Sequence, residues 1–293
     1  MQDRSILEVD TPILDCAGNP DRHIESLTTV LKRPDSSRGL SLYLHTSPEF
    51  AMKRLLAAGS GPIYQICKVF RNNEAGRLHQ AEFTMLEWYR PDFDHHELMD
   101  ETGQLLRNLD LTIPVKTTYA EVFNRYTGLD PHGSGTDTLR DCAMGMGLHT
   151  DTDDRSLVLD LIFSHGITPN LGQDSPQFIY DYPACQAALA RINHGPPTVA
   201  ERFELFINGM EIANGYNELQ DYYELISRFR EENIQRQQAS HPDIPIDTRL
   251  LAALQHGLPP CAGVAVGLDR LLLALTGTTS LADVLSYPLA TVD

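Results

Sequence analysis

The sequence lacks a long apolar run, a paired cysteine motif and a leader-like start. No apolar run among its 293 residues approaches the ~20 residues that a membrane-spanning helix needs. The opening residues, MQDRSILEVDTP, are not typical of a signal peptide. No CxxC pair occurs, which argues against a structural zinc site and fits a reducing compartment; the five cysteines are Cys16, Cys67, Cys142, Cys185 and Cys261. We therefore expect a cytoplasmic protein that does not bind a membrane.

Basic residues are also scarce. Lys and Arg number 23 against 40 Asp and Glu, so the formal net charge is −17. A chain of this charge repels the nucleic-acid backbone over most of its surface, which disfavours a large RNA footprint. A local basic groove remains compatible with it, and one could form around Lys68, Arg71, Arg77 and Arg90. The charge balance fits a small anionic substrate that is held in a local positive pocket.

The two common glycine-rich nucleotide motifs are missing as well. Neither GxxxxGK[ST] nor GxGxxG occurs, so neither a P-loop nor a Rossmann fingerprint is available. Instead, a glycine-bearing strand over 261–268 leads directly into a helix over 270–275, which Asp269 can cap. Arg270 falls in the first helical turn, where a cation opposes the helix dipole. Either an anion bound at the helix start or a carboxylate partner such as Asp269 accounts for this arginine.

A carboxylate-bearing hairpin is the strongest local signal. Asn208-Gly209 separates two strand-like runs, which predicts a two-residue type I′ turn. This turn sets Glu211 opposite Phe206 and Glu204 opposite Ala213, so the two carboxylates are diagonal neighbours on one face, on the order of 7 Å apart. They repel by about 2 kcal/mol at an effective dielectric near 20, and Mg²⁺ would reverse that sign. The alternative is that both point to water on an open sheet face.

Residues 63–71 and 83–90 read as two strands that are joined by a long cationic loop. The loop carries Arg71, Arg77 and His79, and long ordered loops are often functional. The alternative is a solvated loop with incidental arginines. Alternation places four side chains of the second strand on one face: Phe83, Met85, Glu87 and Tyr89.

The remaining elements read as helices and one further strand. In TSPEFAMKRLLAAG, Ser47 fits the N-cap, Pro48 the first helical position and Glu49 the first turn, where the helix dipole alone accounts for an acid. Residues 94–166 look mainly helical, with a capping box formed by Thr118 and Glu121, and we interpret them as an insertion beside a sheet. A strand is predicted over 177–182, and helices over 219–238 and 248–255.

Three features therefore indicate the same ligand, a nucleoside triphosphate: the carboxylate pair, the cationic loop and the arginine at a helix start. VFRNNEAGRLHQAEFTMLEWYR resembles motif 2 of the class II aminoacyl-tRNA synthetases, and GVAVGLDRLLLAL resembles motif 3. TSPEFAMKRLL and FELFINGMEIANGYNEL are similar to the lysine-specific branch. The resemblance covers nearly the whole chain. It implies an α+β fold with an antiparallel sheet flanked by helices, in one catalytic domain over 1–293 with a helical insertion at about 94–170.

Within that class the chain is most similar to truncated paralogues that ligate lysine to elongation factor P. We expect no N-terminal anticodon-binding domain, the chain is acidic, and it carries Ser47 and Ala265 where the synthetases usually have alanine and glycine. The resemblance implies ATP and Mg²⁺ as cofactors, lysine or (R)-β-lysine as substrate, elongation factor P as acceptor and no tRNA. The motif 1 helix that builds the dimer is largely absent from residues 1–10, so we expect any homodimer to be weakened.

The resemblance also implies residue roles. Arg71 and Arg270 are the expected catalytic residues, on the α- and γ-phosphates, and Glu204 and Glu211 the expected Mg²⁺ ligands. The expected ATP contacts are Arg71, Asn72, Asn73, Arg77, His79, Gln80, Phe83, Glu211, Ile212, Gly267 and Arg270, with Phe83 stacked on adenine. The expected amino-acid contacts are Ser47, Pro48, Glu49, Glu87, Tyr89, Glu218 and Ala265. Asn73 and Gln80-Ala81 depart from the family pattern, which bears on the adenine contacts.

Two other functions remain open on the sequence. The chain is alternatively a free-standing synthetase-like enzyme that charges α-lysine onto tRNA, against which Ser47, Ala265 and the acidic composition argue. It is alternatively a catalytically inactive paralogue that binds an amino acid or ATP as a regulator. Such a paralogue is expected to have lost Arg71, Glu211 or Arg270, and all three are present.

Overall fold

The computed structural model describes residues 1–32, 34 and 39–288. Its contacts divide the chain into two compact units. Unit 1 comprises Met1–Asp92, Gln220–Cys261 and Ala265–Asp293, and unit 2 comprises Phe93–Leu219 and Ala262–Val264. Strand β12 (Cys261–Gly267) contributes residues to both.

Unit 1 contains the strands that flank the cationic loop. β5 pairs antiparallel with β6 in a ladder that runs from Ile63↔Tyr89 to Phe70↔Glu82, and β1 pairs parallel with β5. A second small sheet has the order β2-β4-β3. The strands are β1 (Leu7–Glu8), β2 (Leu14–Asp15), β3 (Thr28–Leu31), β4 (Leu40–Leu44), β5 (Ile63–Phe70) and β6 (Glu82–Pro91).

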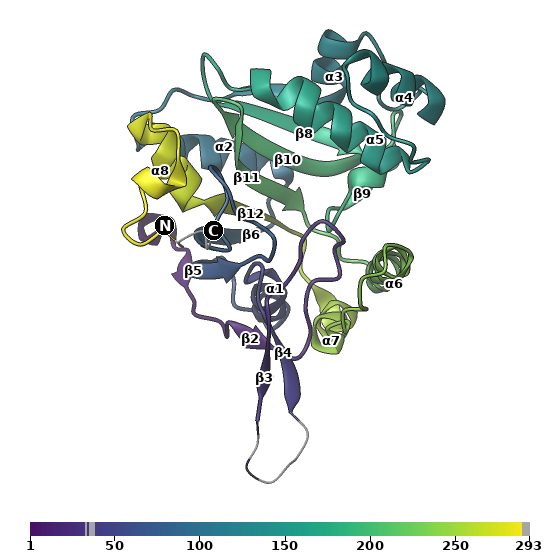
Figure 1. Cartoon of the computed structure of the whole chain (residues 1–293). Coiled ribbons are helices and arrows are strands. Elements are labelled where there is room, and N and C mark those ends of the chain that lie inside the picture. The colour runs from purple at the N-terminus through teal and green to yellow at the C-terminus, as the bar shows by residue number, and fades with distance from the viewer. Residues whose placement is uncertain (33, 35–38, 289–293) are drawn as a thin grey trace. The chain divides into compact units, whose positions relative to one another are not determined.

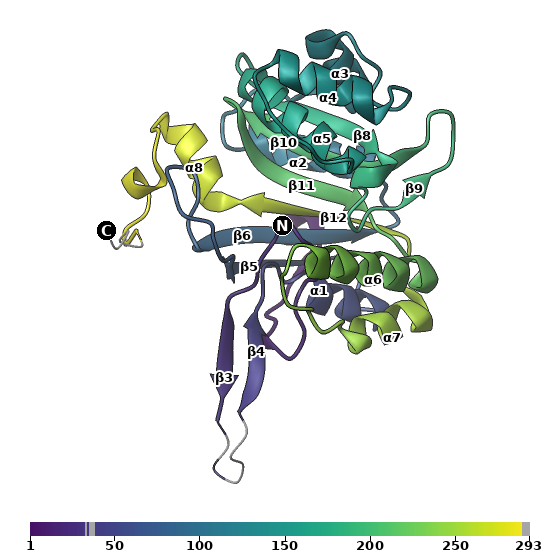
Figure 2. The ribbon, with the colours of Figure 1, turned by 45° about the vertical axis from the view of Figure 1, so that its right-hand side comes forward.

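Four α-helices complete unit 1. Helices α1, α6 and α7 lie beside one another (Figure 2), and α8 follows β12 directly. Their bounds are α1 (Glu49–Ala57), α6 (Tyr222–Gln238), α7 (Thr248–Gly257) and α8 (Leu268–Thr276), and short 3-10 helices span Gln2–Arg4 and Leu281–Asp283. α1 begins one residue later than expected, at Glu49, although the Ser47 hydroxyl still accepts the Glu49 backbone N–H at 3.0 Å. Helix ends commonly shift by this amount.

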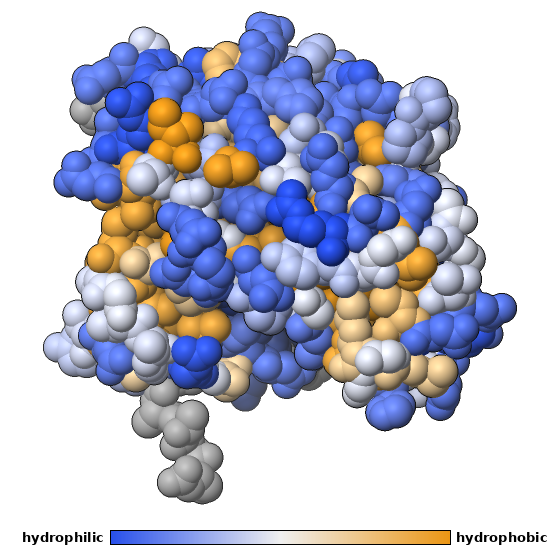
Figure 3. Space-filling view, turned by 90° about the horizontal axis from the view of Figure 1, so that it is seen from above, coloured by the Kyte–Doolittle hydropathy of each residue, from blue (hydrophilic) through white to orange (hydrophobic). Residues whose placement is uncertain are grey.

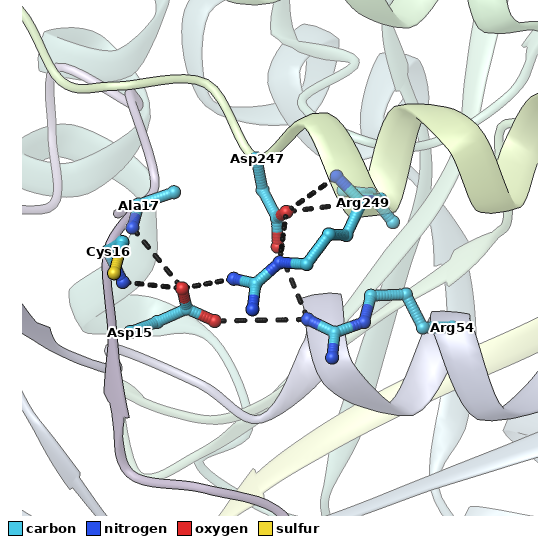
Figure 4. A network of polar contacts seen from close by, with 7 residues as sticks. Asp15, Cys16, Ala17, Arg54, Asp247 and Arg249 are labelled. Atoms are coloured by element: carbon cyan, nitrogen blue, oxygen red, sulfur yellow. Dashed lines mark hydrogen bonds and ion pairs between the residues drawn. The ribbon is translucent and has the colours of Figure 1, made fainter.

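An ion-pair network joins β2, α1 and α7 within unit 1. Asp247, 2% exposed, caps α7 by accepting the backbone N–H groups of Arg249 and Leu250. Its carboxylate also lies 3.6 Å from Arg54, and Arg249 pairs with both Asp247 and Asp15. Figure 4 shows the four charged side chains converging from the three elements. The network connects the last turn of α1, through Arg54, to the start of α7 and to β2.

Unit 2 is a sheet that helices flank on both faces, with α2 (His95–Arg107) packed against β10 and β11. Figure 1 shows α3, α4 and α5 over β8 and β10. The strand order is β11-β10-β8-β7, with β9 also paired to β10. The strands are β7 (Val115–Thr118), β8 (Gln177–Pro183), β9 (Ile192–Asn193), β10 (Val199–Ile207) and β11 (Met210–Asn217). The helices are α2 (His95–Arg107), α3 (Tyr119–Thr127), α4 (Thr136–Gly145) and α5 (Arg155–Ile162), followed by a π-helical turn (Phe163–Ile167) and 3-10 turns (Thr168–Asn170, Ala184–Gln186).

The core of unit 2 is aromatic. The ring of Tyr119 stacks on Phe163 with centroids 4.7 Å apart, and it meets Tyr182 at 4.9 Å. Phe206 packs against Phe163 from β10. Each such ring pair contributes about 0.5–1.5 kcal/mol beyond burial. Because Phe206 lies on β10, which carries Glu204, and Tyr182 lies on the neighbouring strand β8, this core holds β10 in place.

The predicted hairpin forms, but its register differs in part from the expectation. Asn208 and Gly209 both have positive φ, at 51° and 72°, as a type I′ turn requires. Phe206 lies opposite Glu211 as predicted, whereas Glu204 lies opposite Asn214 and not opposite Ala213. A β-bulge causes the difference, because one extra residue on β11 enters the ladder between Glu211 and Ala213.

The expected α+β class is confirmed, with a sheet of mixed rather than wholly antiparallel pairing. The ladders β1·β5 and β7·β8 are parallel. Strand β7 was not expected, because residues 94–166 were read as mainly helical; VKTT is a short, threonine-rich segment directly before the capping box of α3. That capping box, between Thr118 and Glu121, is confirmed.

The surface shown in Figure 3 is mainly polar. On the face shown in Figure 3, hydrophilic residues cover most of the surface and hydrophobic ones gather in smaller groups. Within the described part of the chain, no helix combines the length and the apolarity that crossing a membrane demands.

Candidate active site

A buried acidic cluster in unit 1 contains most of the residues expected to bind an amino acid. We define the acidic cluster as Ser47, Glu49, Lys53, Glu87 and Tyr89. Glu87 lies in the middle of β6 and is 2% exposed. Its Oε2 accepts a hydrogen bond from Ser47 Oγ at 2.6 Å, and its Oε1 accepts one from the Tyr89 hydroxyl, also at 2.6 Å. Ser47, Glu87 and Tyr89 are therefore brought together as predicted.

The acidic cluster perturbs the ionisation of Glu87. Burial, and then the charge of Glu49, raise the pKa of Glu87 to about 7, against the hydrogen bonds from Ser47 and Tyr89 and the charge of Lys53. A carboxyl group with this pKa changes its charge near neutral pH. An ammonium group placed beside it would favour the ionised form and lower the pKa again.

Lys53 was not anticipated from the sequence. Its ammonium lies 2.6 Å from Glu49 Oε1, and its side chain is only 4% exposed. The available signal was the i,i+4 spacing of Glu49 and Lys53 on α1. The helix-dipole explanation of Glu49 is thus incomplete, because this glutamate also balances a buried cation. Two carboxylates and one ammonium leave the cluster short of one positive charge, which suits a substrate amine.

The neighbouring thiol is not a nucleophile. Burial and then the charge of Glu87 raise the pKa of Cys67 to about 12, so the thiolate that covalent catalysis requires is not formed at neutral pH. Gln65 is directly opposite Glu87 in the β5·β6 ladder and is 2% exposed. Its side chain also forms a hydrogen bond with Cys67, which lowers the pKa of the thiol but is outweighed by burial. The region therefore offers polar binding groups rather than a reactive residue.

The cationic loop between β5 and β6 forms the second cluster of unit 1. The Arg71 guanidinium lies over the Phe83 ring, 5.1 Å from its centroid, and 3.6 Å from Glu74. Arg270 Nε donates to the Leu78 carbonyl at 3.1 Å. Arg77 donates to the Thr279 carbonyl at 2.7 Å. Since both bonds join the loop to the α8 region, three of the expected ATP-binding arginines are held near one loop.

The start of α8 differs from the prediction. The helix begins at Leu268, and Gly267 is its N-cap without a side-chain cap. Asp269 therefore does not cap the helix; its carboxylate accepts the backbone N–H of Thr84 at 2.6 Å and so joins α8 to β6. A strand–helix junction without a side-chain cap leaves first-turn N–H groups available, which favours an anion there.

Asn73, which departs from the family pattern, shares a partner with its neighbour Asn72. Asn72 donates its backbone N–H to the Glu25 carbonyl at 2.7 Å, and Asn73 donates its side-chain amide to the Glu25 carboxylate. Asn73 has φ of 60°, a left-handed conformation that asparagine tolerates better than most residues. Glu25 was missed by sequence reasoning, because no local pattern links residues 48 positions apart. His79 lies in the same loop, in a bridge with Gly76.

The expected metal ligands lie on the carboxylate hairpin, which we define as β10 and β11 of unit 2. Glu204 is 9% exposed, so the alternative of two water-facing carboxylates does not hold for it. Its Oε2 accepts the Tyr182 hydroxyl at 2.8 Å, and its Oε1 pairs with Arg202. Burial raises the pKa of Glu204, Arg202 lowers it, and the charge of Glu211 raises it, so the two carboxylates influence one another.

The donor chemistry of this hairpin fits Mg²⁺. Carboxylate oxygens are the ligands that Mg²⁺ takes from proteins, usually one or two per site with the rest from phosphates and water. Among residues 1–32, 34 and 39–288, no group of three or more His, Cys, Asp or Glu side chains is placed to hold a metal ion. A site here would therefore depend on Glu204 and Glu211 together with substrate phosphates.

The other predicted residues occupy structured positions. Ile212 is buried in β11, Glu218 is 1% exposed and bridges to Ala190, and Pro48 is the N-cap of α1. Ala265 and Gly267 are half-buried in β12. Arg202 and Tyr182, which contact Glu204, were missed; the signal for Arg202 was its place two residues before Glu204, on the same strand face.

Comparison with known proteins gives a consistent assignment. The family model "tRNA synthetases class II (D, K and N)" matches residues 1–291. The elongation factor P–(R)-β-lysine ligase of Yersinia enterocolitica is 46% identical over 98% of this chain and 89% of that protein. The ligase of the same name from Proteus mirabilis is 47% identical over the same shares. That from Pasteurella multocida is 45% identical over 97% of this chain and 89% of its own.

Proposed function

The chain belongs to the class II tRNA synthetase family (D, K and N), and on that premise we propose that it is an ATP-dependent ligase for elongation factor P. It adenylates (R)-β-lysine, or lysine, and transfers it to a lysine side chain of that factor. The names of its relatives support both substrates. The acidic cluster is the structural observation that carries the proposal, because the buried Glu87 and the half-buried Glu49 are carboxylates suited to the amines of a diamino acid.

The first step is formation of a mixed anhydride. The amino-acid carboxylate attacks the α-phosphorus of ATP, an oxygen–phosphorus bond forms, and pyrophosphate leaves. The reaction needs no enzyme nucleophile, in line with the protonated state of Cys67. Arg71 is assigned to stabilise the negative charge that builds on the α-phosphate and Arg270 that on the γ-phosphate, so catalysis is positioning and electrostatics.

The second step releases AMP. The ε-amine of the acceptor lysine attacks the anhydride carbonyl, an amide bond forms, and the carbonyl–oxygen bond to AMP breaks. The amine loses a proton in this step. Nothing in it requires a nucleic acid, and the formal charge of −17 disfavours tRNA as the acceptor.

Glu204 and Glu211 would hold Mg²⁺ in unit 2. A bound Mg²⁺ neutralises phosphate charge and orients the phosphate oxygens. The chain's own contribution is the fixed orientation of Glu204, which Tyr182 and Arg202 hold from two sides.

ATP–pyrophosphate exchange tests this proposal. We expect exchange with both amino acids and a larger kcat/KM for (R)-β-lysine than for α-lysine, and we assign the preference to Ser47 and Ala265. Ala265→Gly should reduce the ratio of kcat/KM for (R)-β-lysine to kcat/KM for α-lysine. Ala262→Gly, in the same strand, is the matched control and should leave this ratio unchanged. Equal or reversed preference in the wild type would exclude the specificity, and absence of exchange with either amino acid would exclude the ligase.

A further inference from the structure

A half-buried cation, Arg202, lies beside Glu204 of the carboxylate hairpin. The Arg202 side chain is 16% exposed and pairs with Glu204, which is two residues later on β10. The charge of Glu211 also acts on Arg202, although more weakly than that of Glu204. The positive charge of the guanidinium therefore repels any cation that Glu204 and Glu211 bind.

Arg202 is held by contacts on all sides. Nη1 donates to the Gln186 carbonyl at 2.9 Å and Nε to Asn214 Oδ1 at 3.4 Å, while Nη2 donates to Glu204. The guanidinium carbon also lies over the Tyr182 ring at 4.6 Å and the Tyr216 ring at 5.9 Å. A planar guanidinium bound at its edges and stacked on its face cannot leave without losing most of these contacts. Arg202 is therefore a fixed charge.

Because Arg202 is fixed, its charge contributes to the net charge of the carboxylate hairpin. Ionised Glu204 and Glu211 carry two negative charges, and Arg202 offsets one of them. A divalent cation that arrives alone therefore meets a net charge of −1 and not −2, and the repulsion by Arg202 acts through a medium of reduced dielectric. A divalent cation that arrives with a polyphosphate brings its own negative oxygens and meets less opposition.

We propose that Arg202 is a positioning residue that orients Glu204 and prevents the carboxylate hairpin from binding a bare divalent cation, so that metal is taken up only together with ATP. This inference rests on the proposed assignment of Glu204 and Glu211 to Mg²⁺. It assigns a role to a residue that contacts neither the amino acid nor its acceptor in the proposed reaction. A purely structural Arg202 would stabilise the fold with no effect of its charge on metal binding.

The test measures Mn²⁺, as a probe for Mg²⁺, bound to the full chain without nucleotide at pH 8, by the electron paramagnetic resonance signal of free Mn²⁺. We expect weak binding to the wild type and binding about 10-fold tighter or more to Arg202→Met and Arg202→Gln, which remove the charge. Arg202→Lys keeps the charge and should stay near the wild type. Tyr182→Phe removes the other donor to Glu204 without a change of charge, so it should also stay near the wild type.

Two results would overturn the proposal. One is unchanged or weaker Mn²⁺ binding in a neutral variant whose circular dichroism and melting curve show a folded protein. The other is Mn²⁺ binding to Arg202→Lys that is as tight as binding to the neutral variants, because the positive charge would then not be the cause of weak binding in the wild type. Two neutral variants of different polarity are used because one of them can fail to fold. Failure of the ligase reaction is a separate result, since Mn²⁺ binding without nucleotide depends on neither the amino acid nor the acceptor.

Discussion

The Ser47 hydroxyl donates a hydrogen bond of 2.6 Å to Glu87, which is 40 residues away in the sequence. It joins the start of α1 to the centre of β6 and lowers the pKa of a carboxyl group that burial raises. Ser47 is one of the two positions that we expect, from the sequence resemblance, to distinguish this chain from the lysyl-tRNA synthetases. The bond orients Glu87 and favours its ionised form, which under the proposed function would suit a substrate amine.

Replacing Ser47 tests this relationship. Ser47→Ala removes a hydrogen bond to a charged group, so we expect the KM for the amino acid to rise about 10-fold at pH 7, with little change in the KM for ATP. The effect should shrink at pH 8.5, where Glu87 is ionised without help. The exposed Ser41 in β4 provides the control Ser41→Ala. A pH-independent effect would mean that Ser47 acts on something other than the charge of Glu87.

The pKa of Glu87 predicts a pH dependence of stability. Because its folded-state pKa of about 7 lies above the ordinary 4.5, the folded chain favours the protonated form. The stability this contributes is complete below about pH 4.5 and is lost as the pH rises to about 7, at most about 3 kcal/mol. Urea unfolding of wild type and Glu87→Gln across this range measures it. The variant should lack this component, and parallel curves for the two proteins would contradict the assigned pKa.

Arg71 is expected to act through its fork-like geometry as well as its charge. Arg71→Lys keeps the charge but loses the planar donors and the stacking on Phe83, so ATP–pyrophosphate exchange should fall about 100-fold in kcat. Thermal stability should change little. Arg230, exposed on α6, gives the control Arg230→Lys. A loss below threefold would show that a positive point charge is enough and would remove Arg71 from the catalytic residues.

Asp247 is expected to stabilise unit 1 mainly as a helix cap. Its carboxylate accepts two backbone N–H groups at the start of α7, whereas its partners Arg54 and Arg249 are 31% and 52% exposed, so these ion pairs add little. Asp247→Ala should cost about 1–2 kcal/mol of unfolding free energy, and Asp247→Asn clearly less, because the amide oxygen can still cap. Denaturant midpoints, with the exposed Asp243→Ala as control, measure this. Equal losses in both variants would assign the stabilisation to charge.

Local sequence signals predicted the elements well. Asn208-Gly209 predicted a two-residue turn, and Thr118 with Glu121 predicted a helix start, because both signals act within four residues. Alternation along β6 placed Glu87 and Tyr89 on one face, and their hydrogen bond confirms it. These features follow from backbone geometry, which neighbouring residues determine.

Features that depend on distant residues were not predictable. The bulge at Ile212 changes the partner of Glu204 without a composition signal, since Ile212 is an ordinary strand residue. Asp269 was read as a cap, but it bonds to Thr84, 185 positions away. Lys53 and Arg202 are exceptions. Lys53 lies four residues after Glu49 on a helix and Arg202 lies two residues before Glu204 on a strand, and both spacings were visible in the sequence. A Lys or Arg that lies four residues from a carboxylate on a helix, or two residues from one on a strand, is therefore a candidate ion-pair partner of that carboxylate.

Transfer of label is the most direct test of the central claim. The full chain is incubated with ATP, Mg²⁺ and radiolabelled (R)-β-lysine, together with either elongation factor P or lysine tRNA, and label in the acceptor is counted. We predict label on elongation factor P, lost when its acceptor lysine is replaced, and none above background on tRNA. Label on tRNA and none on the protein would contradict the account and identify a tRNA-charging enzyme.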